Sequence, residues 1–220
     1  MRLVALFVVT SAVLATVPLS GQGRTAPAVA AALQAKYDRI KDFSADFVQH
    51  YESGVLKRKV TERGKLQVKK PGKMRWDYTQ PDEKLFVSDG RRIYLWVPAD
   101  KQVTVTCVPE EDQATTAVLF LVGKGNLTRD FEVTFNGAQQ PGSHSLRLQP
   151  KLPERDYDWL ELVIDEASLQ IRSLTAADRQ GGQSTFVLSN FKENPGLSDK
   201  AFTFSPPRGA DVTSSDPSCR

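Results

Sequence analysis

The stretch of residues 64–96 constrains the fold most, because it holds four short β segments separated by turns. Apolar and polar residues alternate on both sides of Pro71-Gly72, and a proline-containing turn follows at residues 80–82. Two more apolar segments flank Asp89-Gly90. Segments that alternate and are joined by short turns pair with their chain neighbours. This stretch therefore predicts an antiparallel meander.

The last hairpin of this meander is predicted in more detail. Asp-Gly supplies the positive φ angles of a two-residue type I′ turn, which would pair Phe86 with Ile93 and Leu85 with Tyr94. Apolar side chains then cover both faces of the hairpin. One face carries Phe86, Ile93 and Leu95, and the other carries Leu85, Val87, Tyr94 and Trp96.

The two-residue rhythm extends from Val55 to about Cys107 and returns after Asn126, ending in an expected strand at residues 202–204. We expect about eleven strands with almost no crossover helices, and hence a mainly antiparallel β protein. A single sheet of that width must curl strongly or close.

Two helices are expected beside this sheet. The first would begin at Pro27 and end at Ser53-Gly54, because Leu33, Tyr37, Ile40, Phe47 and Tyr51 form one apolar stripe at helical spacing. The second covers residues 110–121, with an acidic start and an apolar end. The first helix could simply pack on the sheet, or could also border a ligand cavity.

The N-terminus has the pattern of a secretory signal peptide, with a charge at Arg2, an apolar run and small residues near Gly23. We expect residues 1–23 to be removed, residues 24–212 to form one domain and residues 213–220 to be a flexible tail within a polar end that starts at Asp211. No cysteine near the cleavage zone could carry a lipid anchor, so a soluble exported protein is expected. Whether Cys107 pairs with Cys219 stays open.

Several classes of function find no support in the sequence. The only histidines, His50 and His144, belong to no metal-ligand motif, and no phosphate-binding glycine motif is present. The net charge of +3 is too small to suggest nucleic acid binding. We therefore expect a protein that is not an enzyme, needs no metal or cofactor and binds no nucleic acid.

A basic region occupies residues 57–75. Such a region is typical of a solvated strand edge, where lysines oppose aggregation. It could instead attract phospholipid headgroups or an acidic partner. The sequence leaves these interpretations open.

The two apolar faces of the meander suggest a ligand cavity. Two helices cannot cover a wide sheet, so some apolar surface must close on itself or remain as a cavity, and a curled antiparallel sheet with a helical lid commonly holds an apolar ligand.

Three runs of sequence resemble a known family. They are VKKPGKMRWDYTQPDEKLFVSDG, LQAKYDRIKDFSADFVQ and FTFSPPRGADV, and the match in order and spacing covers residues 28–212. Together they look like the periplasmic outer-membrane lipoprotein carrier family, LolA. The resemblance implies an incompletely closed, strongly curled β-barrel with an α-helical lid. It also implies a monomeric periplasmic chaperone for acylated lipoproteins, which would receive them from the inner-membrane LolCDE complex and pass them to the outer-membrane receptor LolB.

The resemblance also suggests roles for particular residues. In the family an arginine before the proline of the second sheet segment helps to hold the lid shut, and here Lys70 takes that position. Lysine keeps the charge but lacks the planar guanidinium, so a less sharply held closed state is expected. The expected cavity wall consists of Leu66, Val68, Met74, Trp76, Phe86, Ile93 and Leu95, and the expected lid of Val118, Leu119, Phe120 and Leu121.

Each of these wall and lid residues could instead be ordinary core. An alternative function stays open as well, namely another exported lipid-binding or glycolipid-binding protein, or an envelope-stress sensor domain of the same fold.

Overall fold

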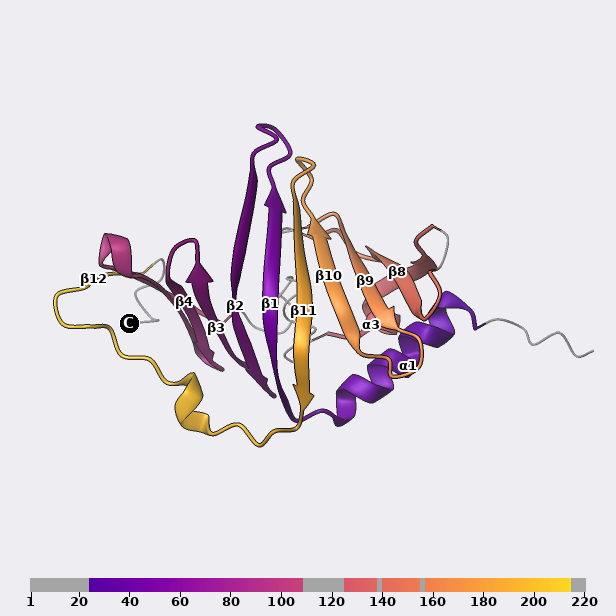
Figure 1. Ribbon diagram of the computed structural model, residues 1–220, viewed down its shortest axis with the longest axis horizontal. Helices are drawn as coiled ribbons and strands as arrows, with labels where there is room; N and C mark the ends of the chain where they lie inside the picture. Colours follow the sequence, from indigo (N-terminus) through magenta and orange to yellow (C-terminus); the bar gives the residue numbers. More distant parts are fainter. Residues whose placement is uncertain (1–23, 109–124, 138–139, 155–156, 215–220) are drawn as a thin grey trace, which may run out of the picture.

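The computed structural model describes residues 24–108, 125–137, 140–154 and 157–214. Twelve strands form one sheet in the order β12-β6-β5-β4-β3-β2-β1-β11-β10-β9-β8-β7 (Figure 1). The strands are β1 (Asp42–Glu52), β2 (Lys59–Lys69), β3 (Lys73–Gln80), β4 (Lys84–Asp89), β5 (Arg92–Val97), β6 (Gln102–Cys107), β7 (Phe131–Phe135), β8 (Ser143–Pro150), β9 (Trp159–Asp165), β10 (Ile171–Ala177), β11 (Gln183–Glu193) and β12 (Asp211–Ser214).

Neighbouring strands are antiparallel at every pairing except one, because β12 runs parallel to β6. Within the described residues β7 and β12 form its two edges and do not pair with each other, so the sheet is open. The expected mainly antiparallel, incompletely closed sheet is confirmed, with twelve strands where about eleven were predicted. Strand β1 joins two meanders, β1 to β6 and β7 to β11.

The first helix, α1 (Ala26–Arg39), begins as expected, with Thr25 as N-cap and Pro27 in its first turn. Its expected continuation to residue 52 is wrong. The chain becomes extended at Ile40 and enters β1, where Phe43, Ala45 and Phe47 alternate with less buried Ser44 and Asp46. Phe43 and Phe47 are four residues apart, which suits a helix face and a strand face equally. Pairing with β2 and β11 selects the strand.

The hairpin of β4 and β5 differs from the prediction in register. Phe86 lies opposite Leu95 and Leu85 opposite Trp96, which leaves a four-residue connection from residue 89 to residue 92. The Asp89 carboxylate accepts hydrogen bonds from the main-chain N–H groups of Arg91 and Arg92, at 2.8 and 2.7 Å, and so stabilises the wider turn. Because the register differs by two residues, the predicted composition of each face is unchanged.

The C-terminal segment covers the second apolar face of this hairpin. Residues 202–204 are not the expected strand; a short 3₁₀ helix, η2 (Asp199–Phe202), lies against β3 and β4 and buries Phe202. The ring of Phe204 contacts that of Tyr94, with centroids 5.4 Å apart. The chain then adds β12 to the sheet, so residues 213 and 214, the first two of the expected tail, belong to a strand.

The basic region is not a strand edge, because β2 and β3 lie inside the sheet. Several of its cations are engaged on the outer face. Asp199 of η2 accepts hydrogen bonds from Lys69 and Lys73, at 2.9 and 3.0 Å, and Arg75 forms an ion pair with Asp77. The two contacts with Asp199 attach the C-terminal segment to the sheet.

The main core lies on the opposite, inner face of the sheet. There α1 buries Val29, Ala30, Leu33 and Tyr37 in one continuous cluster with apolar side chains of the strands. This helix also contacts β7 and the short helix α3 (Leu127–Asp130). It therefore covers part of the inner face, near the β7 side of the sheet (Figure 1).

Candidate binding surface on the inner face of the sheet

All seven residues expected to line a cavity share the inner face of β2 to β5. Cross-strand pairing arranges them in two rows, because residues directly opposite each other point to the same side. The first row is Leu66, Trp76, Phe86 and Leu95, and the second is Val68, Met74, Ser88 and Ile93. The structure thus brings the seven together, and their role as an acyl-chain wall remains a prediction.

The exposure of the apolar side chains in these rows increases toward β5, whereas the polar Ser88 on β4 is buried. Leu66, Val68, Met74 and Trp76 are buried, Phe86 and Ile93 are half-buried, and Leu95 is 38% exposed. An apolar ligand would meet the β4 and β5 side chains first, because burying exposed apolar surface is favourable. The side chains on β2 and β3 form the base of the surface.

Aromatic side chains that the sequence analysis did not assign to the site complete this base. Trp76 lies 5.0 Å, centroid to centroid, from both Phe47 on β1 and Phe186 on β11, and Phe47 lies 5.0 Å from Tyr78. Phe47 was missed because its segment was interpreted as helix. The alternation of Phe43, Ala45 and Phe47 was the signal that could have found it.

A short polar network lies beside the aromatic rings. The Tyr78 hydroxyl donates to Gln49 Oε1 at 3.0 Å, and Gln49 Nε2 donates to Ser184 Oγ at 2.9 Å. Burial raises the pKa of Tyr78 far above its ordinary value, and the negative charge of Glu62 raises it further. Tyr78 thus stays a neutral donor, and the inner face near it carries satisfied polar groups.

Lys70 connects the end of α1 to the end of β2. Its ammonium donates to the carbonyl oxygen of Tyr37 and lies 5.6 Å from the centre of the Tyr37 ring. Its main-chain N–H donates to the carbonyl oxygen of Lys41 at 2.8 Å. Burial lowers the pKa of Lys70, and the charge of Asp38 partly opposes this. The expected lid residues, Val118 to Leu121, lie outside the described residues, so the observed partner of Lys70 is α1.

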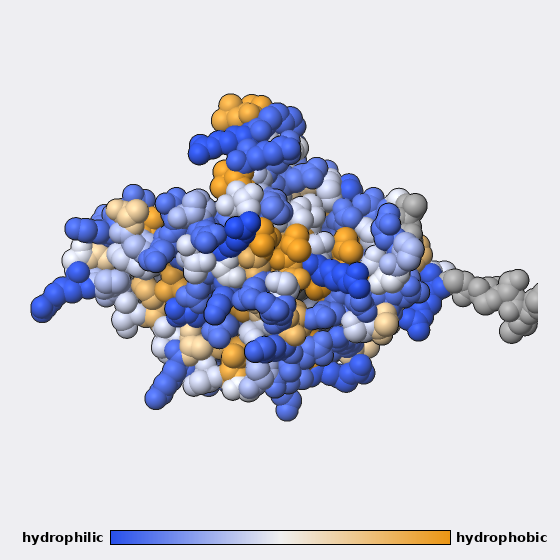
Figure 2. Space-filling model, in the orientation of Figure 1, coloured by the Kyte–Doolittle hydropathy of each residue, from blue (hydrophilic) through white to orange (hydrophobic). Residues whose placement is uncertain are grey.

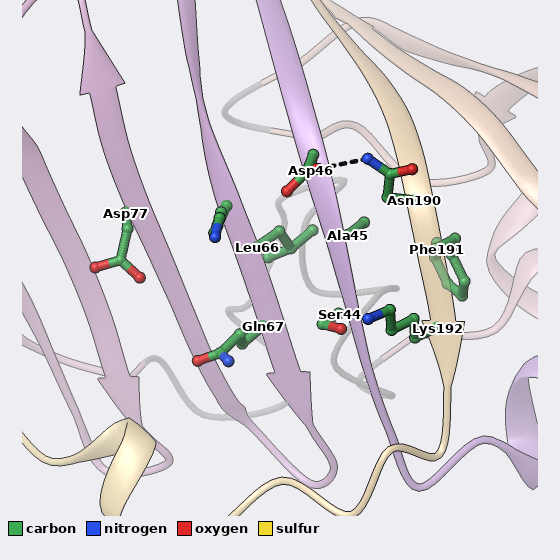
Figure 3. Close-up of a pocket in the computed structure, with 10 residues that line it drawn as sticks. Ser44, Ala45, Asp46, Leu66, Gln67, Asp77, Asn190, Phe191 and Lys192 are labelled. Carbon is green, nitrogen blue, oxygen red and sulfur yellow. Dashed lines mark hydrogen bonds between the residues drawn. The ribbon is translucent and has the colours of Figure 1, made fainter.

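A polar depression of about 600 Å³ lies on the other side of the sheet (Figure 3). Ser44, Asp46, Gln67 and Asp77 contribute to its lining, and Asp46 accepts a hydrogen bond from Asn190 Nδ2 at 2.7 Å. Charged and amide groups would have to lose their hydration to accommodate an acyl chain, which is unfavourable. The inner face is therefore the better candidate for an apolar ligand.

No group of three metal-ligating side chains occurs within the described part of the chain. His50 Nδ1 is 3.1 Å from Thr61 Oγ1 on β2, and His144 lies beside Phe135. None of the helices in the described ranges is long and apolar enough to cross a membrane. Cys107 is disulfide-bonded, and the only other cysteine in the sequence, Cys219, lies outside the described residues.

Comparisons with known proteins agree with this architecture. The family model for the outer membrane lipoprotein carrier protein LolA matches residues 38–205. The outer-membrane lipoprotein carrier protein of Actinobacillus pleuropneumoniae serotype 7 is 30% identical over 83% of this chain and 82% of that protein. The one from Legionella pneumophila strain Lens is 32% identical over 82% of this chain and 87% of that protein.

Among solved structures, an uncharacterized conserved protein from Thermus thermophilus has the same fold, with a TM-score of 0.53 and 11% identity over 84% of this chain and 96% of that one. The family model spans well over half of the sequence, and two carrier proteins match most of it. The chain belongs to the outer membrane lipoprotein carrier protein LolA family.

Proposed function

We propose that this protein is a soluble periplasmic lipoprotein carrier that holds acyl chains against the inner face of its open sheet. One observation carries the proposal: in a chain of this family, the inner face presents two rows of side chains that are apolar except for the buried Ser88. Their apolar members are buried on β2 and β3 and more exposed on β4 and β5. With this increase in exposure, an apolar ligand could cover the exposed side chains on β4 and β5 while it packs beside the buried ones on β2 and β3.

The energetics of lipid transfer define what such a carrier needs. Each acyl CH₂ group that leaves a bilayer costs about 0.8 kcal/mol, so a triacylated protein resists extraction by tens of kcal/mol. The sequence contains no phosphate-binding glycine motif that would let it use a nucleotide. We infer that a monomeric carrier accepts its cargo from an energised inner-membrane complex of the LolCDE type and releases it to a receptor of the LolB type.

Lys70 has a defined place in this proposal. It attaches the C-terminal end of α1 to the sheet beside the inner face, and a positive charge at a helix C-terminus is favourable. We propose that this contact helps to hold the closed state and yields when cargo enters. A single ammonium is a weaker latch than a planar guanidinium.

Co-purification tests the function directly. The protein is expressed with its N-terminal segment, together with a tagged lipoprotein, and the periplasmic fraction is purified on the tag. A soluble 1:1 complex is expected. The control is the same lipoprotein with its acylated cysteine replaced by serine, which carries no acyl chains. Equal binding of the acyl-free form would contradict the carrier function, because the apolar face would then contribute nothing.

A further inference from the structure

We propose that the tip of the β1–β2 hairpin, residues 53–59, docks reversibly on the surface of an anionic phospholipid bilayer. The hairpin projects beyond the rest of the sheet and ends in an apolar tip surrounded by hydrophilic side chains (Figures 1 and 2). Val55 and Leu56 form the tip and are 75% and 79% exposed. Adjacent apolar residues at the end of a projection mark an interaction site rather than ordinary surface.

The tip has a defined conformation. Ser53 N–H donates to the carbonyl oxygen of Arg58 at 3.0 Å, and Lys57 N–H donates to the carbonyl oxygen of Ser53 at 3.0 Å. The Ser53 hydroxyl accepts a further hydrogen bond from Leu56 N–H at 3.3 Å. These bonds hold the turn closed and leave both apolar side chains outside it. Little conformational entropy would therefore be lost on docking.

The neighbouring hairpin supports the tip from behind. A Cβ atom at Gly54 would lie 2.0 Å from the carbonyl oxygen of Gln180 and 2.6 Å from main-chain atoms of Gly181 and Gly182. The turn between β10 and β11 therefore packs directly on the β1–β2 tip. Because the main chains of the two hairpins are in direct contact, the β10–β11 turn limits bending of the β1–β2 tip when the tip meets a surface.

Positive charges lie directly behind the apolar pair. Lys57, Arg58 and Lys59 are exposed, and Arg179 lies in the supporting turn. Lys59 is 3.3 Å from Glu52, but its side chain remains 77% exposed, so its charge stays accessible. By contrast, Lys69 and Lys73 of the basic region are engaged by Asp199. Three consecutive exposed cations therefore directly follow the apolar pair.

This arrangement matches the layering of a bilayer surface. Val55 and Leu56 would enter the boundary between headgroups and acyl chains, and the three cations that directly follow them in the sequence would remain at the level of the anionic headgroups. A few apolar residues combined with a few cations give weak, reversible adsorption. Adsorption of this kind is independent of the proposed cargo site, because the tip lies beyond the rows of the inner face.

Vesicle co-flotation with the protein purified from the periplasm after export tests the inference. Vesicles of phosphatidylethanolamine and phosphatidylglycerol are compared with vesicles of phosphatidylcholine alone. We expect binding to the anionic vesicles and a large loss of binding in high salt. Replacing both apolar tip residues (Val55→Ser with Leu56→Ser) should weaken binding at least about tenfold. Removing the tip charges (Lys57→Gln, Arg58→Gln and Lys59→Gln) should cost roughly fivefold per residue.

Matched controls separate the tip from general effects of charge and hydrophobicity. Lys65→Gln, Lys101→Gln and Lys192→Gln remove the same total charge from other exposed positions, and Val187→Ser removes an exposed apolar side chain from the outer face. These variants should bind anionic vesicles within about threefold of the unchanged protein. Affinity for a fluorescent acyl probe, which reports the inner face, should be the same in all variants and shows that they are folded.

Three results would overturn the inference. The first is the absence of binding to anionic vesicles, and the second is an equal loss in the tip and control triple variants. The third is cross-linking of the tip to a periplasmic protein without vesicle binding, which would identify a protein partner instead of a bilayer. None of these results bears on the 1:1 cargo complex, so the two proposals can fail separately.

Discussion

The ammonium group of Lys70 donates a hydrogen bond to the main-chain carbonyl oxygen of Tyr37. The contact joins the last turn of α1 to the end of β2, and the adjacent main chains are joined again by the bond from Lys70 N–H to the Lys41 carbonyl. The Tyr37 carbonyl oxygen also accepts the capping hydrogen bond from Ile40 N–H at 3.1 Å, so the ammonium is its second donor, and a cation near a helix C-terminus is favourable. Lys70 therefore stabilises the position of α1 over the inner face.

Replacing Lys70 with leucine should loosen this attachment. A charge-assisted hydrogen bond contributes about 1.5–3 kcal/mol, so we expect Lys70→Leu to lower the free energy of unfolding by about 2 kcal/mol. It should also increase binding of an apolar dye, because α1 moves away more readily. Lys41→Leu is the matched control, since Lys41 is exposed and loses the same charge. Identical dye titrations for the two variants would remove Lys70 from the closing mechanism.

The two faces of the sheet should respond differently to the same substitution. Leu95 on the inner face and Val187 on the outer face have similar exposures of 38% and 41%. Leu95→Gln should weaken binding of a fluorescent fatty-acyl probe about tenfold, because it removes apolar surface from the ligand contact. Val187→Gln should leave the affinity unchanged. If both substitutions changed the affinity for the probe equally, the inner face around Leu95 would not be the binding site.

Acid should loosen η2 by protonating Asp199. Hydrogen bonds from Lys69 and Lys73 hold the pKa of Asp199 below its ordinary value. A carboxyl group whose pKa is depressed by folding stabilises the protein above its unfolded value of about 4, and this contribution is lost as the pH falls through the folded value. The protection of the η2 amides, measured as the exchange rate relative to that of the unfolded chain at the same pH, should therefore decrease below about pH 4.

Asp199→Asn should show the lower protection already at pH 7 and should match the unchanged protein in acid. Asp82→Asn, at an exposed turn, serves as the control. If the Asp199 variant exchanged at the normal rate at pH 7, the two lysine contacts would not be what holds η2.

Gly64 should not tolerate a side chain. An added Cβ would lie 1.9 Å from the Asp77 carbonyl oxygen and 2.9 Å from the Phe47 ring. We expect Gly64→Ala to lower the free energy of unfolding by about 2–4 kcal/mol in urea titrations. Gly137→Ala is the comparison, because no atom lies within 4 Å there and only its positive φ of 63° adds a cost, about 1 kcal/mol. A Gly64 variant as stable as the Gly137 variant would contradict this packing.

Loss of the Cys107 disulfide should destabilise the protein. Cross-links that close long loops contribute about 2–4 kcal/mol. Cys107→Ser should therefore lower the midpoint of thermal unfolding, and a reducing agent should do the same to the unchanged protein. The reducing agent should have no further effect on the variant. If a reducing agent still lowered the midpoint of thermal unfolding of Cys107→Ser, the disulfide would not involve Cys107.

The sequence could predict much of the candidate surface, because alternation places every second residue on one face whatever the register. The predicted partner of Phe86 was Ile93 and the observed one is Leu95, yet both belong to the inner face. A register error of two residues preserves the face, whereas an error of one would have exchanged the two faces. The set of seven wall residues is for this reason insensitive to turn geometry.

What the sequence by itself determined was the alternation, the turns and the apolar character of both faces of β4 and β5. Only the tertiary structure decided how residues 42–52 fold, because Phe43 and Phe47 satisfy the helical and the strand period alike, and pairing with β2 and β11 makes the choice. It also decided which apolar face remains for a ligand. Phe202 and Phe204 cover the outer face from far along the chain, and no local pattern encodes which distant segment packs on a given face.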